Sequence, residues 1–163
     1  MSTEDAINKY SIKQYETDRK PIRKNKKPEK KVEAACLTWL HDNGFNMSVV
    51  DSGSVWGGQN RGYGVQKAPT GFSDLCGCTP MGMGCFIELK AKGKRSALRM
   101  AQREFLKLKI LKGCFACVVD SADNLAEQYD GWIKARHSSV DDSIFFLMNK
   151  LPKKKSEEDG PLF

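Results

Sequence analysis

Several features that mark common classes of protein are missing from this sequence. No run of about 18 apolar residues, the length of a membrane-spanning helix, occurs anywhere in it. The first residues, Met-Ser-Thr-Glu-Asp, lack the basic and then apolar layout of a secretory signal. These two absences argue against a membrane or secreted protein, and we expect the chain to act inside a cell.

Histidine is scarce, with 2 residues, and the 6 cysteines include a single C-x-x-C pair, Cys114 and Cys117. That pair lies in an apolar stretch typical of a strand, where residues three apart point to opposite faces and cannot easily chelate one ion. Structural zinc is therefore the weaker alternative. We interpret the cysteines as free thiols of a reducing compartment.

Positive charge dominates what is present. The net charge is +7, and the basic residues are concentrated in two segments. Residues 1–31 carry 10 Lys or Arg against 5 Asp or Glu, and residues 86–112 carry 9 against 2. Because concentrated positive charge attracts polyanions, this distribution predicts a nucleic-acid partner. The alternative is that both segments are ordinary solvated faces.

The length of 163 residues suits one domain with tails. Residues 1–28 have little apolar periodicity and predict a flexible basic arm, which contacts DNA phosphates or is simply solvated. Residues 29–151 are the expected domain. Residues 152–163 predict a charged tail that ends in the apolar Pro161-Leu162-Phe163.

Within the domain, the sequence pattern predicts alternating helices and strands. The elements expected in order are a helix (29–43), a strand (45–51), a long glycine-rich loop (52–70), two strands (near 71–75 and 86–90), a helix, a strand (114–120), a helix (122–135) and a last segment (143–148), strand or helix. Ser96 is a candidate cap for the middle helix. The core stripe predicted for that helix is Ala101, Phe105, Leu108 and Leu111.

The most informative stretch is Gly71-Phe72-Ser73-Asp74-Leu75, followed after a glycine-rich turn by Phe86-Ile87-Glu88-Leu89-Lys90. Both segments read as short strands of a hairpin. Side chains alternate along a strand, so Glu88 and Lys90 share one face, and antiparallel pairing would place Asp74 beside Glu88. Two carboxylates suit Mg²⁺ or Mn²⁺, and a nearby lysine can orient or deprotonate a metal-bound water.

The order Asp74, then Glu88-Leu89-Lys90, resembles the signature of the PD-(D/E)XK nucleases, with Ser73 where the family has Pro. The flanking Gly71, the downstream Gln102-Arg103-Glu104-Phe105 and Gly113 are similar to the VRR-NUC branch, the virus-type replication and repair nucleases. The resemblance covers residues 29–121 and implies an α/β fold. That fold has a restriction-endonuclease-like core, αβββαβ, in which helices flank a mixed central sheet.

The resemblance also implies a role for each residue of the motif. Asp74 and Glu88, with the backbone carbonyl of Leu89, would bind Mg²⁺ or Mn²⁺, Lys90 would activate water, and Gln102 would orient the site. Glu33 would support the metal, or it is an ordinary exposed residue of its helix. The basic residues expected to bind nucleic acid are Arg61, Lys67, Lys92, Lys94, Arg95 and Arg99.

The expected function is metal-dependent hydrolysis of DNA phosphodiesters, selective for branched DNA such as Holliday junctions or flaps, in viral or bacterial replication, recombination or repair. The resemblance implies a homodimer in the cytoplasm of a bacterium or of a virus-infected host cell. The alternatives are a restriction-like or exonucleolytic nuclease and a non-catalytic nucleic-acid-binding module. Leu162 and Phe163 resemble the Leu-Phe ends by which bacterial repair proteins bind the sliding clamp, although the upstream Gln is absent.

Overall fold

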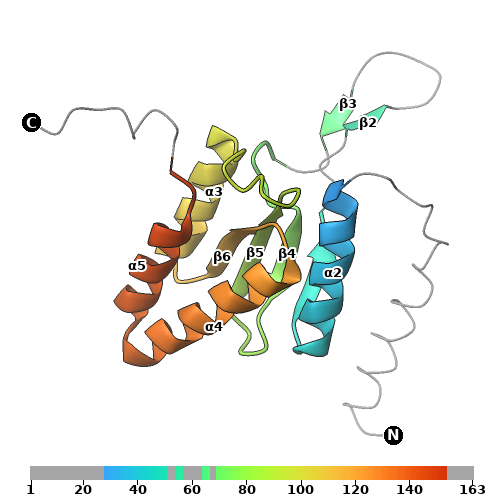
Figure 1. Cartoon of the computed structure of the whole chain (residues 1–163). Coiled ribbons are helices and arrows are strands. Elements are labelled where there is room, and N and C mark those ends of the chain that lie inside the picture. The colour runs from blue at the N-terminus through green and yellow to red at the C-terminus, as the bar shows by residue number, and fades with distance from the viewer. Residues whose placement is uncertain (1–27, 51–53, 57–63, 67–68, 154–163) are drawn as a thin grey trace, which may run out of the picture.

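The computed structural model describes residues 28–50, 54–56, 64–66 and 69–153. Its main body is a four-stranded mixed sheet with four helices, in the order αβββαβαα (Figure 1). The elements are α2 (Pro28–Asp42), β1 (Asn46–Val49), β2 (Ser54–Trp56), β3 (Gly64–Gln66), β4 (Leu75–Cys78), β5 (Gly84–Leu89), α3 (Met100–Leu111), β6 (Phe115–Val119), α4 (Ala122–Ser138) and α5 (Val140–Lys150). The mixed α/β sheet flanked by helices agrees with the sequence prediction.

Strand β5 lies inside the sheet, whose strand order is β1-β4-β5-β6. It pairs antiparallel with β4 on one side and parallel with β6 on the other. Helices α2 and α4 pack on one face of the sheet, α3 packs on the other, and α5 lies against α4 and beside β6 (Figure 1). Both faces of β5 are therefore covered, which explains why five consecutive residues near its end include four that are buried.

The core is built from alternate residues of neighbouring strands. Leu75 is opposite Ile87, and Ile87 is opposite Cys117, so these three side chains share one face of the sheet. All three are buried on the side of α2 and α4, where Trp132 of α4 is also fully buried. The other face, toward α3, receives the alternate residues of β5, including Glu88.

Helix α3 differs from the prediction in its start and in its buried face. It begins at a later residue than a Ser96 cap would set, and its buried residues are Leu106 and Ile110. Leu108 and Leu111, predicted as core, are 55% and 53% exposed. The physical reason is that apolar residues lie on more than one face of this helix, and its packing against β6 and α5 selects the face that is buried.

Other elements follow the prediction with small changes. The first predicted helix is α2, which ends before Gly44, a residue with φ of 75°. The undecided last segment is the helix α5. The stretch predicted as one long loop contains the antiparallel pair of β2 and β3, so the prediction of loop throughout residues 52–70 was wrong.

The basic arm up to residue 27, Arg61, Lys67 and residues 154–163, with Leu162 and Phe163, lie outside the described residues. The predictions that concern them therefore stay predictions. In the part of the chain that the structure describes, no helix is both long enough and apolar enough to cross a membrane.

Candidate metal-binding and catalytic site

The β4–β5 hairpin brings the two predicted carboxylates together. In its register Leu75 is opposite Ile87, so Asp74, immediately before β4, faces Glu88 across the pair. The backbone N–H of Leu89 donates a hydrogen bond to Asp74 Oδ2 at 2.8 Å, which fixes the Asp74 side chain against the end of β5. Asp74 thus lies just before β4 rather than in it, and it faces Glu88 as predicted.

Lys90 and Glu88 lie on the same side of β5, as the alternation of side chains predicts. The Lys90 ammonium donates to Glu88 Oε1 at 2.7 Å, and both side chains are largely shielded from water. A charge-assisted hydrogen bond in such surroundings is stronger than an exposed ion pair. The pair therefore holds the end of β5 and the lysine in one geometry.

Glu88 is more deeply buried than a residue on the solvent side of a sheet would be, with only 1% of its surface exposed. Burial, followed by the negative charge of nearby Asp74, raises the pKa of the Glu88 carboxyl from its ordinary 4.5 to about 7, while Lys90 opposes the rise. Its second oxygen, Oε2, is buried and has no hydrogen-bond partner among the described residues. A buried acceptor left unpaired costs free energy unless a ligand satisfies it.

Gln102 connects helix α3 to the carboxylates. Its Nε2 donates to Glu88 Oε1, and its Oε1 accepts from Lys90 Nζ at 3.3 Å and from the backbone N–H of Arg99 at 3.2 Å. The sequence placed Gln102 on the flank of its helix, within reach of the site, and the structure brings it there. One amide side chain thereby orients Glu88, Lys90 and the first turn of α3 together.

The donor set fits a small, hard cation. Among the described residues no three His, Cys, Asp or Glu side chains gather into a group able to hold a metal ion without further ligands. Mg²⁺ is commonly held by one or two carboxylates with water and substrate phosphate completing its shell, so Asp74 and Glu88 fit it. The unpaired Oε2 of Glu88 is the atom that such an ion would satisfy.

Glu33 is engaged elsewhere in the fold. Its carboxylate forms an ion pair with Lys30, one turn earlier on α2, at 2.7 Å. It does not combine with Asp74 and Glu88 into a three-ligand group. The structure therefore favours, of the two interpretations of Glu33, the ordinary helix residue.

The predicted DNA-binding residues divide into two kinds. Lys92, Lys94 and Arg99 are exposed on the segment between β5 and α3 and at the start of α3. The Arg95 guanidinium instead donates to the backbone carbonyls of Val118 and Lys150, at 3.1 and 3.2 Å. Arg95 thus ties β6 to the end of α5, and its role as a DNA contact stays a prediction.

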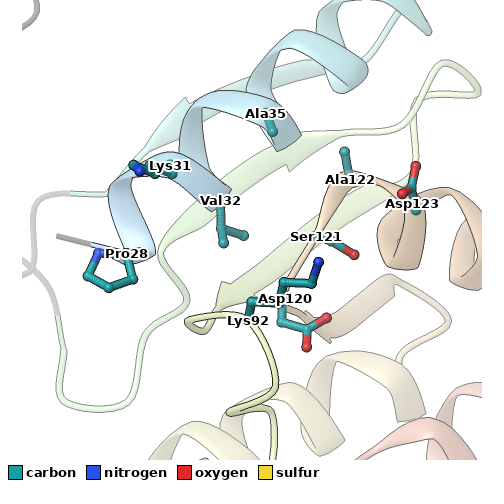
Figure 2. A pocket seen from close by; sticks show the side chains of 9 residues that line it. All are labelled: Pro28, Lys31, Val32, Ala35, Lys92, Asp120, Ser121, Ala122 and Asp123. Carbon is teal, nitrogen blue, oxygen red and sulfur yellow. The ribbon is translucent and has the colours of Figure 1, made fainter. Parts of the chain in front are cut away.

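Two cavities lie near these residues. The α2 cavity, of about 460 Å³, separates α2 from the turn between β6 and α4; Figure 2 shows Val32 on one side and Asp120 and Ser121 on the other. The α3 cavity, of about 310 Å³, is bounded by the loop before β4 and by the first turn of α3. Only the α3 cavity includes Asp74 and Gln102 in its wall. The sequence did not predict either cavity, because each depends on contacts between distant segments.

No family model, curated protein or solved structure matches the chain.

Proposed function

We propose that the protein is a Mg²⁺- or Mn²⁺-dependent deoxyribonuclease that hydrolyses phosphodiester bonds. The observation that carries the proposal is the buried Glu88 carboxylate, which has an unpaired oxygen, lies beside Asp74 and is bonded to Lys90. Above about pH 7, where Glu88 is charged, this arrangement is unfavourable because the two carboxylates repel each other. A bound divalent cation removes that repulsion, and the surrounding basic residues suit a polyanionic substrate.

In this proposal each residue of the cluster has one task. Asp74, Glu88 and the Leu89 carbonyl would hold the cation, which would supply Lewis-acid stabilisation of the phosphate and lower the pKa of a bound water. Lys90, held by Glu88 and Gln102, would orient the attacking water. Gln102 keeps the lysine and the glutamate in register. Lys92, Lys94 and Arg99 attract the DNA.

The same residues support the resemblance to the VRR-NUC branch of the PD-(D/E)XK nucleases, and with it a restriction-endonuclease-like fold. From that resemblance we extend the proposal to a homodimer that cuts branched DNA such as Holliday junctions or flaps, in viral or bacterial replication, recombination or repair. Binding of Leu162 and Phe163 to a sliding clamp belongs to the same extension. A restriction-like or exonucleolytic enzyme is the alternative substrate class.

The test compares cleavage of a four-way junction, a flap and a linear duplex with Mg²⁺, for the wild type and Asp74→Ala. We expect wild-type cleavage of the branched substrates and a loss on the order of 10³-fold in the variant, since a metal carboxylate contributes several kcal/mol to the transition state. Asp130→Ala, which removes an exposed carboxylate from α4, is the matched control and should cleave normally.

Each part of the proposed function would be contradicted by a different result. Equal rates on the three substrates would remove branch selectivity but leave the nuclease. Wild-type activity in Asp74→Ala would remove the metal assignment. Binding of DNA without Mg²⁺-dependent cutting by the wild type would favour the non-catalytic binding module.

A further inference from the structure

The α3 cavity adjoins the candidate site directly. It is lined by Pro69, Thr70, Gly71, Phe72 and Asp74 of the segment before β4 and by Arg99, Ala101 and Gln102 of α3. Asp74 and Gln102 thus line this cavity and also belong to the candidate site with Glu88 and Lys90. A group that fills the cavity would lie next to a cation held by Asp74.

The wall contributed by α3 is electropositive. The helix begins after Arg99 and has no acidic residue in its first turn, so the partial positive charge of its N–H groups is not offset there. Arg99 is exposed and forms no ion pair within the described residues. An anion placed in the cavity would meet the guanidinium and the helix end together.

The opposite wall of the α3 cavity, which contains Asp74, favours an anion only when a cation is also bound. Asp74 is a carboxylate in the same cavity, and Glu88, opposite Asp74 in the hairpin, has an oxygen without a partner among the described residues. Without a cation these groups repel an anion, whereas a cation between them and the anion would attract it. A cation held by the carboxylates would therefore make the cavity favourable for a phosphate beside Arg99.

We propose that the α3 cavity is a phosphate-binding subsite in which Arg99 holds a phosphate of the nucleic acid beside the carboxylate pair. The subsite rests on the proposed nuclease function, because that function supplies the cation and the substrate. The phosphate has two sources with shared chemistry, an internal phosphodiester and a terminal phosphate. Arg99 is in this proposal a substrate-binding residue that Gln102 helps to position through the Arg99 N–H.

The experiment measures DNA affinity by fluorescence anisotropy with Mg²⁺, in a Lys90→Met background so that cleavage does not consume the DNA. Adding Arg99→Gln should weaken binding about tenfold and lower the slope of log affinity against log salt by about one. Lys107→Gln, an equal charge loss at an exposed position of the same helix, is the control and should change the slope less. In EDTA the Arg99→Gln effect should shrink, because the conditional attraction is lost.

Two arms separate the phosphate sources. A strand with hydroxyl ends and the same strand with a 5′-phosphate are compared: an equal Arg99→Gln effect on both identifies an internal phosphodiester, and an effect on the phosphorylated strand alone identifies a terminal phosphate. Equal slope changes in Arg99→Gln and Lys107→Gln, or an effect that is the same in EDTA, overturn the subsite. If the wild type binds in this Arg99-dependent way but never cleaves, the nuclease function fails while the subsite stands. If the wild type cleaves and Arg99→Gln binds DNA normally, the subsite fails while the nuclease function stands.

Discussion

The ends of the two parallel strands, β5 and β6, each carry acidic and polar residues, yet they differ in how those groups are satisfied. At the end of β6, Asp120 Oδ2 accepts from the Gly93 N–H at 2.8 Å, and the Ser121 hydroxyl caps α4 by accepting from the Asn124 N–H at 3.1 Å. At the end of β5, Glu88 is buried, has one oxygen without a partner among the described residues and lies beside a second carboxylate.

This difference separates structural polar groups from candidate functional ones. The end of β6 is complete without a ligand, even though the larger, α2 cavity lies there (Figure 2). The end of β5 has a buried oxygen without a partner among the described residues, and a bound ion would remove the cost in free energy of leaving it unpaired. The unsatisfied group, rather than the volume of a cavity, therefore locates the candidate site.

The largest expected effect is that of neutralising the Glu88 carboxylate at the end of β5. Glu88→Gln should lower Mg²⁺-dependent cleavage on the order of 10³-fold, about 4 kcal/mol of transition-state stabilisation. In the metal-free protein at pH 8 the change removes a buried negative charge but leaves Lys90 without its ion-pair partner, so the two effects on stability oppose each other and the net change should be smaller than the change in cleavage. Cleavage assays and urea denaturation in EDTA measure the two effects.

Asp120→Ala supplies the counterpart at β6. It should retain cleavage while losing about 1 kcal/mol of stability with the hydrogen bond to Gly93. If Asp120→Ala abolishes cleavage and Glu88→Gln does not, the comparison between the two strand ends is reversed.

The pH dependence of stability sharpens the comparison further. Because the pKa of Glu88 in the folded protein is about 7, above its ordinary 4.5, the folded state binds this proton more tightly. The resulting stability is present below pH 4.5 and is lost as the pH rises through 7, by up to about 1.4 kcal/mol per pH unit. The free energy of unfolding of the wild type minus that of Glu88→Gln, measured in EDTA, should fall over this range.

Added Mg²⁺ at pH 8 should restore the wild type and leave Glu88→Gln unchanged, because the ion binds the charged carboxylate. A difference that is flat between pH 4.5 and 8 would contradict the burial of an ionisable Glu88.

The smallest effects concern two basic neighbours between β5 and α3. Arg95→Leu removes the hydrogen bonds to Val118 and Lys150 and should cost about 2 kcal/mol of stability, with DNA affinity retained in the folded protein. Lys94→Gln at an exposed position should leave stability within about 0.5 kcal/mol and flatten the salt dependence of DNA binding. Thermal unfolding measures the stability of each variant and anisotropy titrations measure its DNA affinity. A loss of DNA affinity in Arg95→Leu but not in Lys94→Gln would identify Arg95 as a DNA contact.

The local parts of this molecule could be predicted from the sequence. Alternation along β5 put Glu88 and Lys90 on one side, and the hairpin put Asp74 opposite Glu88, because a short turn fixes the register between neighbouring strands. The position of Gln102 near the site also followed from its place on the flank of a helix. These relations need only a few adjoining residues.

What was missed depends on distant contacts. The burial of Glu88 requires α3 to cover β5, and the face that α3 buries is chosen by β6 and α5 rather than by its own apolar pattern. Arg95 is satisfied by carbonyls 23 and 55 residues away in the chain. Neither partner has a signal near Arg95 itself, so these two hydrogen bonds could not be predicted from the sequence.

Gly71 has no side chain, and this absence allows the loop before β4 to contact the first turn of α3. Its φ is 86°, and a Cβ there would lie 2.6 Å from the backbone carbon and oxygen of Ala101. The loop and the first turn of α3 are therefore in contact through their main chains, with no adjustable side chain between them. Any larger residue at this position would displace the turn that carries Gln102. The alignment of Gln102 with Glu88 and Lys90 thus depends on glycine, which has no Cβ, at position 71.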